Sequence, residues 1–339
     1  MDPLVVIFFV VIGLMRVVQK VCSKKVSDKI DGSTYFHYGG YYQLLSAIFS
    51  LVALCFVGFH GFSGTVVLYA VGTAVFMAIE LFTEIEALKG TSLLVVQMFA
   101  AGAVVVPCLF GNFFIEGQEM SVYQWIGLAL FMVAMYFMVS EGKTKQSEEI
   151  SQDAVDVGQD TPTKQDAPKQ KMSLKTIVML VLMLIGAGGT TVVQDAFGNL
   201  VEDGNTAMYS FLIFAINAVV LYLCYLAQAL LVKKGAKTMQ VEPLAETQVA
   251  PKKEKKLKPL PMALLICGAF LALALFAINI LVTELTSMVH PSLLFPLSNA
   301  IAIIVAMLVG RIMYKETMSV RNVIGIVLCA VSMAIITFL

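Results

Sequence analysis

Two stretches of this chain, MSVYQWIGLALFMVAM at 120–135 and MSVRNVIGIVLCAVSM at 318–333, share Met, Ser, Val, Ile, Gly, Leu, Val and Met at corresponding positions. Upstream, FMAIELFTEIEALKGTSLL at 76–94 aligns without a gap with FAINILVTELTSMVHPSLL at 276–294. There Phe, Leu, Thr, Glu, Ser, Leu and Leu match. Because both matches occupy the same place in their half of the chain, the sequence predicts two related repeats.

The chain divides into ten long apolar stretches. With 59% apolar and only 14% charged residues, and a mean hydropathy of +0.85, it lies outside the range of soluble domains, where about 25% of residues are charged. Most of the stretches reach the roughly 20 residues that a helix needs to cross a bilayer. We predict helices at 4–22, 36–59, 65–88, 91–114, 121–140, 174–200, 206–232, 260–285, 291–313 and 320–339. The predicted fold class is therefore an all-α polytopic membrane protein with ten transmembrane helices.

The basic residues indicate the orientation. All 23 Lys and Arg residues lie in or beside the odd-numbered connections between these stretches, and the even connections and both termini have none. Positive charge accumulates on the cytoplasmic side of membrane proteins. We therefore expect a multi-pass protein of the cell membrane with its odd connections in the cytoplasm and both termini outside.

The odd number of helices per half determines how the two halves relate. Five helices in each half place the second copy upside down relative to the first, which is an inverted-topology repeat. Such symmetry provides two near-equivalent conformations, each open to one side, around a site near the middle of the membrane. A weaker match of Val17-Val18-Gln19 with Val192-Val193-Gln194 is too short to count alone.

Two polar segments separate from the apolar part of the chain. Residues 141–173 and 233–259 contain few large apolar residues, so they cannot bury enough surface to offset chain entropy. We predict a first five-helix repeat at 3–140, a disordered cytoplasmic linker at 141–173, and a second repeat at 174–339 that contains the polar cytoplasmic loop 233–259.

Each repeat closes with a polar turn followed by a sequence like G-x-E-x-[ST]-x-x-Q-x-x-G. The first copy is GQEMSVYQWIG at 117–127, and the second is KETMSVRNVIG at 315–325. This pattern and the two five-helix repeats resemble the EamA-like branch of the drug/metabolite transporter superfamily. The resemblance implies a ten-helix transporter fold but does not indicate a substrate. Members of that family commonly have both termini in the cytoplasm, whereas the charges here predict the reverse.

Carboxylates inside the predicted third helix are candidates for a substrate or coupling-ion site. Ionisable groups in a membrane helix cost roughly 2.5–3.5 kcal/mol on insertion scales, so they usually have a function. Glu80 and Glu84 share a helix face, and Glu84 matches Glu284 in the second repeat. For Glu84 and Glu284, a gate or cation site and an interfacial anchor remain equal alternatives. Glu80 lies deeper and could couple transport to protons, whereas Glu86 is expected to pair with Lys89.

Polar side chains on other helices complete the candidate site. Gln97, Asn279, Ser292 and Asn299 could line a polar cavity between the third, fourth, eighth and ninth helices, although each single amide is also explained by interhelical hydrogen bonding. Arg16 either extends to the cytoplasmic face or turns inward to a carboxylate such as Glu80. The glycines at 186, 188 and 189 are expected to permit close helix packing.

We predict a secondary transporter that moves a small organic solute by alternating access. The six cysteines and three histidines form no metal-ligand pattern, and nucleotide-binding or hydrolase motifs are absent from the sequence. We therefore predict no enzymatic activity, cofactor, metal or nucleic-acid partner. The expected partners are a small-molecule substrate and the lipid bilayer, and both a monomer and a homodimer are compatible with the sequence. The main alternative is a polytopic enzyme acting on lipid or lipid-linked substrates; a non-transporting scaffold would not explain the inverted repeat.

Overall fold

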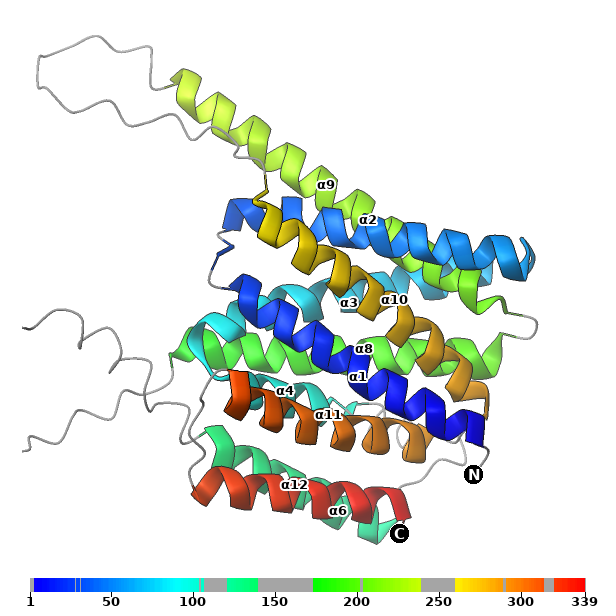
Figure 1. The fold of residues 1–339 in the computed structure, drawn as a ribbon, viewed down its shortest axis with the longest axis vertical. Helices are drawn as coiled ribbons and strands as arrows, with labels where there is room; N and C mark the ends of the chain where they lie inside the picture. Colours follow the sequence, from blue (N-terminus) through cyan, green and yellow to red (C-terminus); the bar gives the residue numbers. More distant parts are fainter. Residues whose placement is uncertain are drawn as a thin grey trace, which may run out of the picture.

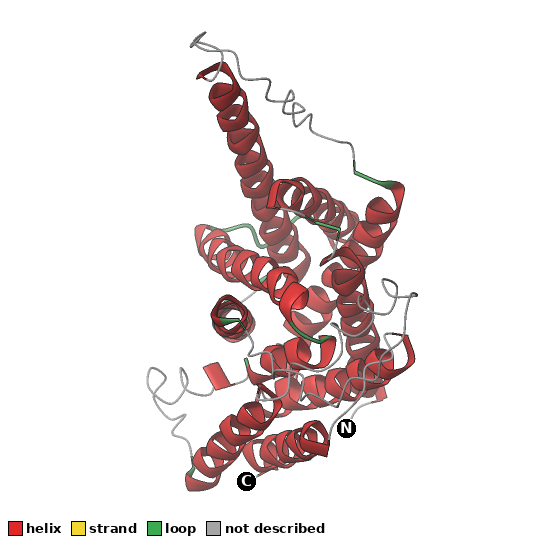
Figure 2. Ribbon diagram, turned by 90° about the vertical axis from the view of Figure 1, so that its left-hand side faces the viewer, coloured by secondary structure: helices red, strands yellow, loops and turns green. Residues whose placement is uncertain are grey.

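The protein is helical throughout its described part. The computed structural model describes residues 3–27, 29–30, 32–103, 105–106, 121–139, 173–201, 204–238, 260–288, 291–313 and 320–338. These residues form helices and their connections, with no strand among them (Figure 2). Residues 141–172 of the predicted linker and most of the polar loop 233–259 lie outside the described residues.

A helix occupies each of the ten predicted apolar stretches. The helices of the first half are α1 (Pro3–Ser27), α2 (Gly32–Val57), α3 (Gly64–Gly90), α4 (Leu93–Gly102) and α6 (Val122–Val139). Those of the second half are α8 (Leu174–Leu200), α9 (Thr206–Thr238), α10 (Met262–Met288), α11 (Pro291–Met313) and α12 (Val320–Phe338).

Short polar side chains start several of these helices. The Ser63 hydroxyl accepts a hydrogen bond from Val66 N at the start of α3, and the Ser92 hydroxyl does the same for Val95 N at the start of α4. The Asn205 side-chain oxygen accepts from the backbone nitrogens of the first turn of α9. Each satisfies a backbone donor that the first helical turn leaves free.

Three helices end five or more residues away from their predicted ends. The first helix was expected to end at residue 22, but α1 continues to Ser27 because its polar last turns pack inside the protein, with Lys20 and Lys24 both buried. The helix predicted to end at 232 continues to Thr238. The helix predicted at 91–114 is interrupted after Gly102 by a turn at Ala103, and its part beyond residue 106 lies outside the described residues.

The helices pack in pairs that join the two halves of the chain (Figure 1). α3 packs on α8, α1 on α10, α2 on α9 and α6 on α12. α1 begins and α12 ends at the same edge of the bundle in Figure 1. The opposite edge holds the basic last turns of α1 and α3.

The bundle has the surface of a membrane-embedded protein. Six of the described helices are long and apolar enough to span a bilayer, namely α1, α2, α3, α8, α9 and α10, and shorter apolar segments occur in α6 and α12. Large apolar side chains are exposed along them, for example Leu68, Val122, Leu223 and Phe270. Such a surface matches lipid better than water.

Candidate functional site

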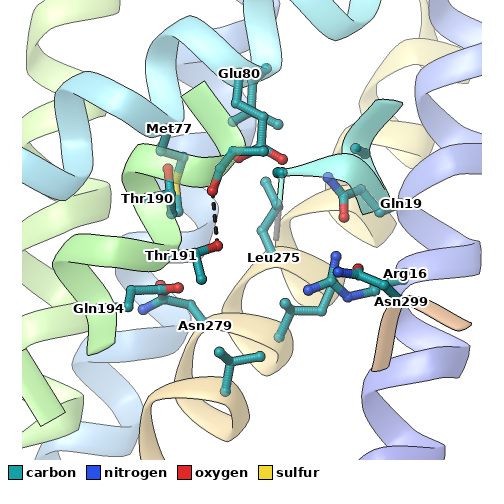
Figure 3. A pocket seen from close by; sticks show the side chains of 16 residues that line it. Arg16, Gln19, Met77, Glu80, Thr190, Thr191, Gln194, Leu275, Asn279 and Asn299 are labelled. Carbon is teal, nitrogen blue, oxygen red and sulfur yellow. Dashed lines mark hydrogen bonds between the residues drawn. The ribbon is translucent and has the colours of Figure 1, made fainter. Parts of the chain in front are cut away.

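A polar cavity of about 70 Å³ lies between six helices, α1, α3, α4, α8, α10 and α11 (Figure 3). Polar side chains line it from five of them: Arg16, Gln19, Glu80, Thr190, Thr191, Gln194, Asn279 and Asn299. Its apolar lining includes Met77, Leu81, Leu275, Ile278 and Val282. Arg16 and Glu80 are the charged side chains that line the cavity among the described residues.

Three buried polar atoms at this cavity have no hydrogen-bond partner within the described part of the chain. They are the Nε of Arg16, the hydroxyl of Thr190 and the side-chain oxygen of Asn299. The side chains of Thr190 and Asn299 are more than nine-tenths buried. A buried donor or acceptor without a partner costs about 1–3 kcal/mol, so the cavity is suited to a polar occupant.

A glycine in α8 sets the position of Glu80. A Cβ at Gly186 would lie 2.7 Å from the backbone nitrogen of Glu80 and 3.0 Å from the carbonyl oxygen of Phe76. Only a residue without a side chain allows α8 to approach the backbone of α3 this closely. This confirms the packing role expected for Gly186, and it brings Glu80 beside the α8 threonines that line the cavity.

Between the cavity and the basic edge of the bundle, α1 and α3 are joined by buried charges. The Lys20 ammonium donates to the Glu84 carboxylate at 2.7 Å, with the two side chains 4% and 1% exposed. One turn further, Lys24 donates to the backbone oxygen of Leu88 at 3.0 Å. Arg16 and Glu80 lie one helical turn before Lys20 and Glu84, on the cavity side. Neither of them forms an ion pair with a described residue.

On the other side of the cavity the helices are joined by neutral groups. The Gln194 side chain of α8 donates to the Asn279 oxygen of α10, and the Asn279 amide donates to the Ser210 hydroxyl of α9 at 2.6 Å. All three side chains are buried. One side of the cavity is thus closed by a buried ion pair and the opposite side by hydrogen bonds between neutral side chains.

The structure brings four of the predicted site residues together. Arg16, Glu80, Asn279 and Asn299 line the cavity, and Arg16 reaches inward, which was one of the two alternatives for it. Figure 3 shows Arg16 and Asn299 on one side of the cavity, with Thr190, Thr191 and Gln194 on the other.

The other predicted residues lie elsewhere. Glu84 is held by Lys20 outside the cavity lining, and Gln97 is fully buried with no hydrogen-bond partner among the described residues. Glu284 is partly exposed and is not part of the lining, while the side chain of Ser292 falls outside the described part. Glu86 pairs with Lys89, as predicted, and also accepts from Lys175 at 3.0 Å.

Sequence reasoning missed Gln19, Gln194, Thr190 and Thr191. A signal existed for the two glutamines, because they end the Val-Val-Gln segments that match weakly between the halves. For the threonines, only the neighbouring glycines 186, 188 and 189 gave an indication.

No protein-family profile matches the chain, and no curated protein sequence matches it. Solved structures do resemble it in fold. One of them, titled "Crystal structure of protein", has a TM-score of 0.59 and 12% sequence identity, and the match covers 99% of this chain and 97% of that one. At this identity the likeness shows a shared fold over nearly the whole chain.

Proposed function

We propose that the protein is a secondary transporter that moves a small organic solute or metabolite across the cell membrane by alternating access. In this proposal its ten helices all span the bilayer as two inverted five-helix repeats, and the fold is that of an EamA-like transporter. The cavity described above is the solute-binding site.

The helix contacts support the inverted repeat. The proposed symmetry exchanges α1 with α8, α2 with α9, α3 with α10, α4 with α11 and α6 with α12. Under this exchange the α3–α8 contact becomes α10–α1, the α2–α10 contact becomes α9–α3, and the α1–α11 contact becomes α8–α4, and all of these contacts occur. The α2–α9 and α6–α12 contacts correspond to themselves.

The position of the cavity carries the proposal. Its lining comes from three exchangeable helix pairs, α1 with α8, α3 with α10, and α4 with α11. A polar site at the interface of inverted repeats is the arrangement that alternating access requires, because the same site can face either side when one repeat rocks against the other. The Lys20–Glu84 pair and the Gln194–Asn279–Ser210 chain are then the two contacts that must open in turn.

The proposal includes an orientation. The basic edge of the bundle faces the cytoplasm and both termini face outward, because positive residues are retained on the cytoplasmic side. A reporter that is active only in the cytoplasm should be silent when fused after Leu339. The same reporter should be active when it is inserted within 141–173, and the reverse pattern would contradict the orientation.

Solute profiling tests the transport activity itself. Vesicles containing the purified protein are incubated with an extract of small metabolites, and their contents are measured by mass spectrometry against protein-free vesicles. We expect a restricted set of solutes to accumulate and to exchange with internal solute. If no solute moves faster than in protein-free vesicles, the transporter proposal fails.

Glu80 carries the proposed coupling to protons. A carboxylate at a cavity that opens alternately to the two sides can take up and release a proton on each side. Glu80→Gln should therefore insert normally and lose the pH-dependent or cation-selective part of uptake. Glu86→Gln, on the same helix but in a surface ion pair, is the matched control and should retain it.

A further inference from the structure

We infer that the solute is a small zwitterion, whose anionic group binds Arg16 and whose cationic group binds Glu80. The inference rests on the proposed transport function and specifies the chemical class of its substrate. The observation that carries it is a guanidinium and a carboxylate that line one buried cavity without forming an ion pair with each other.

The neighbouring turn of the same two helices shows what is unusual here. α1 and α3 run in the same direction in Figure 1, so the four-residue steps Arg16, Lys20 on α1 and Glu80, Glu84 on α3 stay in register. The Lys20 Nζ and the Glu84 Oε2 lie 2.7 Å apart in an ion pair. Arg16 and Glu80 form no ion pair with each other, and both line the cavity (Figure 3).

The charges of the lining select the kind of solute. A buried charge that has no partner is costly, and it is most costly inside a membrane. An anionic solute would pair with Arg16 alone, a cationic solute would pair with Glu80 alone, and an uncharged solute would leave both without a direct ion pair. A zwitterion satisfies both charges and adds no net charge to the cavity.

Other lining groups fit the same solute. The unpaired Nε of Arg16 is a donor for an anionic oxygen, and guanidinium groups bind carboxylates with two parallel hydrogen bonds. The unpaired side-chain oxygen of Asn299 lies on the Arg16 side of the cavity (Figure 3) and can accept a hydrogen bond from an N–H group of the solute. The apolar lining, with Leu275, Ile278 and Val282 from α10, can contact a short aliphatic side chain.

Solutes of similar size that lack one of the two charged groups test the contribution of each group. Vesicles with the purified protein are assayed for uptake of alanine, of lactate, which lacks the cationic group, and of isopropylamine, which lacks the anionic group. Equivalent sets built on glycine and on valine vary the side chain. Because a solute that cannot form one of the two charged hydrogen bonds should bind about tenfold or more weakly, we expect a zwitterion to be taken up at least about tenfold better than both of its analogues in at least one set.

Two variants should change this preference in opposite ways. In Arg16→Gln the zwitterion should lose its advantage over the amine, and in Glu80→Gln it should lose its advantage over the hydroxy acid. Arg16→Lys keeps the charge and should keep the ranking with weaker uptake, which verifies that a substituted residue 16 is tolerated. Arg311→Gln and Glu86→Gln remove charges away from the cavity, and they should leave the preference unchanged.

The inference is overturned if no zwitterion is preferred in any set, or if the preference survives unchanged in both Arg16→Gln and Glu80→Gln. These results are distinct from failure of the transporter proposal. If solutes from the metabolite extract accumulate but none of the zwitterions is preferred, transport stands and the zwitterion class is wrong. If nothing is taken up from the extract or from the probe sets, the transport function itself has failed.

Discussion

The contact between α1 and α3 and the contact between α8 and α10, which the proposed repeat would exchange, are built differently. The first contains the buried Lys20–Glu84 ion pair, whereas the second contains the hydrogen bond between the Gln194 and Asn279 amides. Charge thus lies on one side of the cavity and neutral polar groups lie on the other.

This difference has an energetic consequence. Separating opposite charges held 2.7 Å apart at low dielectric costs more than separating two neutral amides, and hydrogen bonds between membrane helices average only about 0.6 kcal/mol. Opening the α1–α3 contact should therefore cost more than opening the α8–α10 contact. We expect the cavity to be reached more readily from the α8–α10 side, and each prediction below tests one part of this comparison.

The largest effect is expected for Lys20→Met. The substitution leaves the Glu84 carboxylate buried without its partner, so the free energy of unfolding should fall by about 3–5 kcal/mol. The measurement is unfolding of the purified protein in detergent or bilayers, followed by loss of helical signal. Lys175→Gln removes the partner of an exposed pair and is the control, with an expected change of about 1 kcal/mol or less.

The double variant Lys20→Met/Glu84→Met isolates the interaction. Replacing both charges by apolar side chains of similar length removes the unpaired charge, so most of the lost stability should return. If the double variant is destabilised by the sum of the two single effects, the two residues act independently. The α1–α3 side would then not be closed by an ion pair.

A smaller effect is expected for Gly186→Ala. The added methyl group would meet the backbone of α3 at Glu80, and overpacking of this kind costs about 1–3 kcal/mol. Gly72→Ala lies in the same α3–α8 contact, but its methyl group would meet Val193 at an ordinary 3.5 Å, so it should be neutral or stabilising. Unfolding and uptake are measured together, because displacing Glu80 should also reduce uptake. Equal behaviour of the two alanine variants would show that Gly186 does not position Glu80.

The sequence predicted the helices better than it predicted their contacts. Hydrophobic length located every helix of the described residues, because a membrane helix must be long and apolar wherever it packs. It also identified four cavity residues, Arg16, Glu80, Asn279 and Asn299, because ionisable groups and amides are rare inside such helices.

The remaining residues of the site required knowledge of which helices are neighbours. Lys20 was assigned to a cytoplasmic connection because it lies near the end of an apolar stretch, and nothing in the sequence shows that α3 lies against it. Gln97 was expected at the cavity because it is a mid-helix amide, but the rotation of α4 leaves it outside the lining. Helix rotation follows from packing against neighbours, which a single sequence does not specify.

The smallest effect is expected for Asn279→Leu, on the side of the cavity closed by amides. This substitution removes the hydrogen bonds to Gln194 and Ser210, and at the membrane-protein average of about 0.6 kcal/mol per bond the two losses together cost about 1.2 kcal/mol. Gln97→Leu is the matched control: it replaces a buried amide with no partner among the described residues, so stability should stay unchanged or rise. Unfolding measurements on both variants give the difference. If Asn279→Leu proves as costly as Lys20→Met, the two sides of the cavity are equally hard to open, and the expected preference for access from the α8–α10 side disappears.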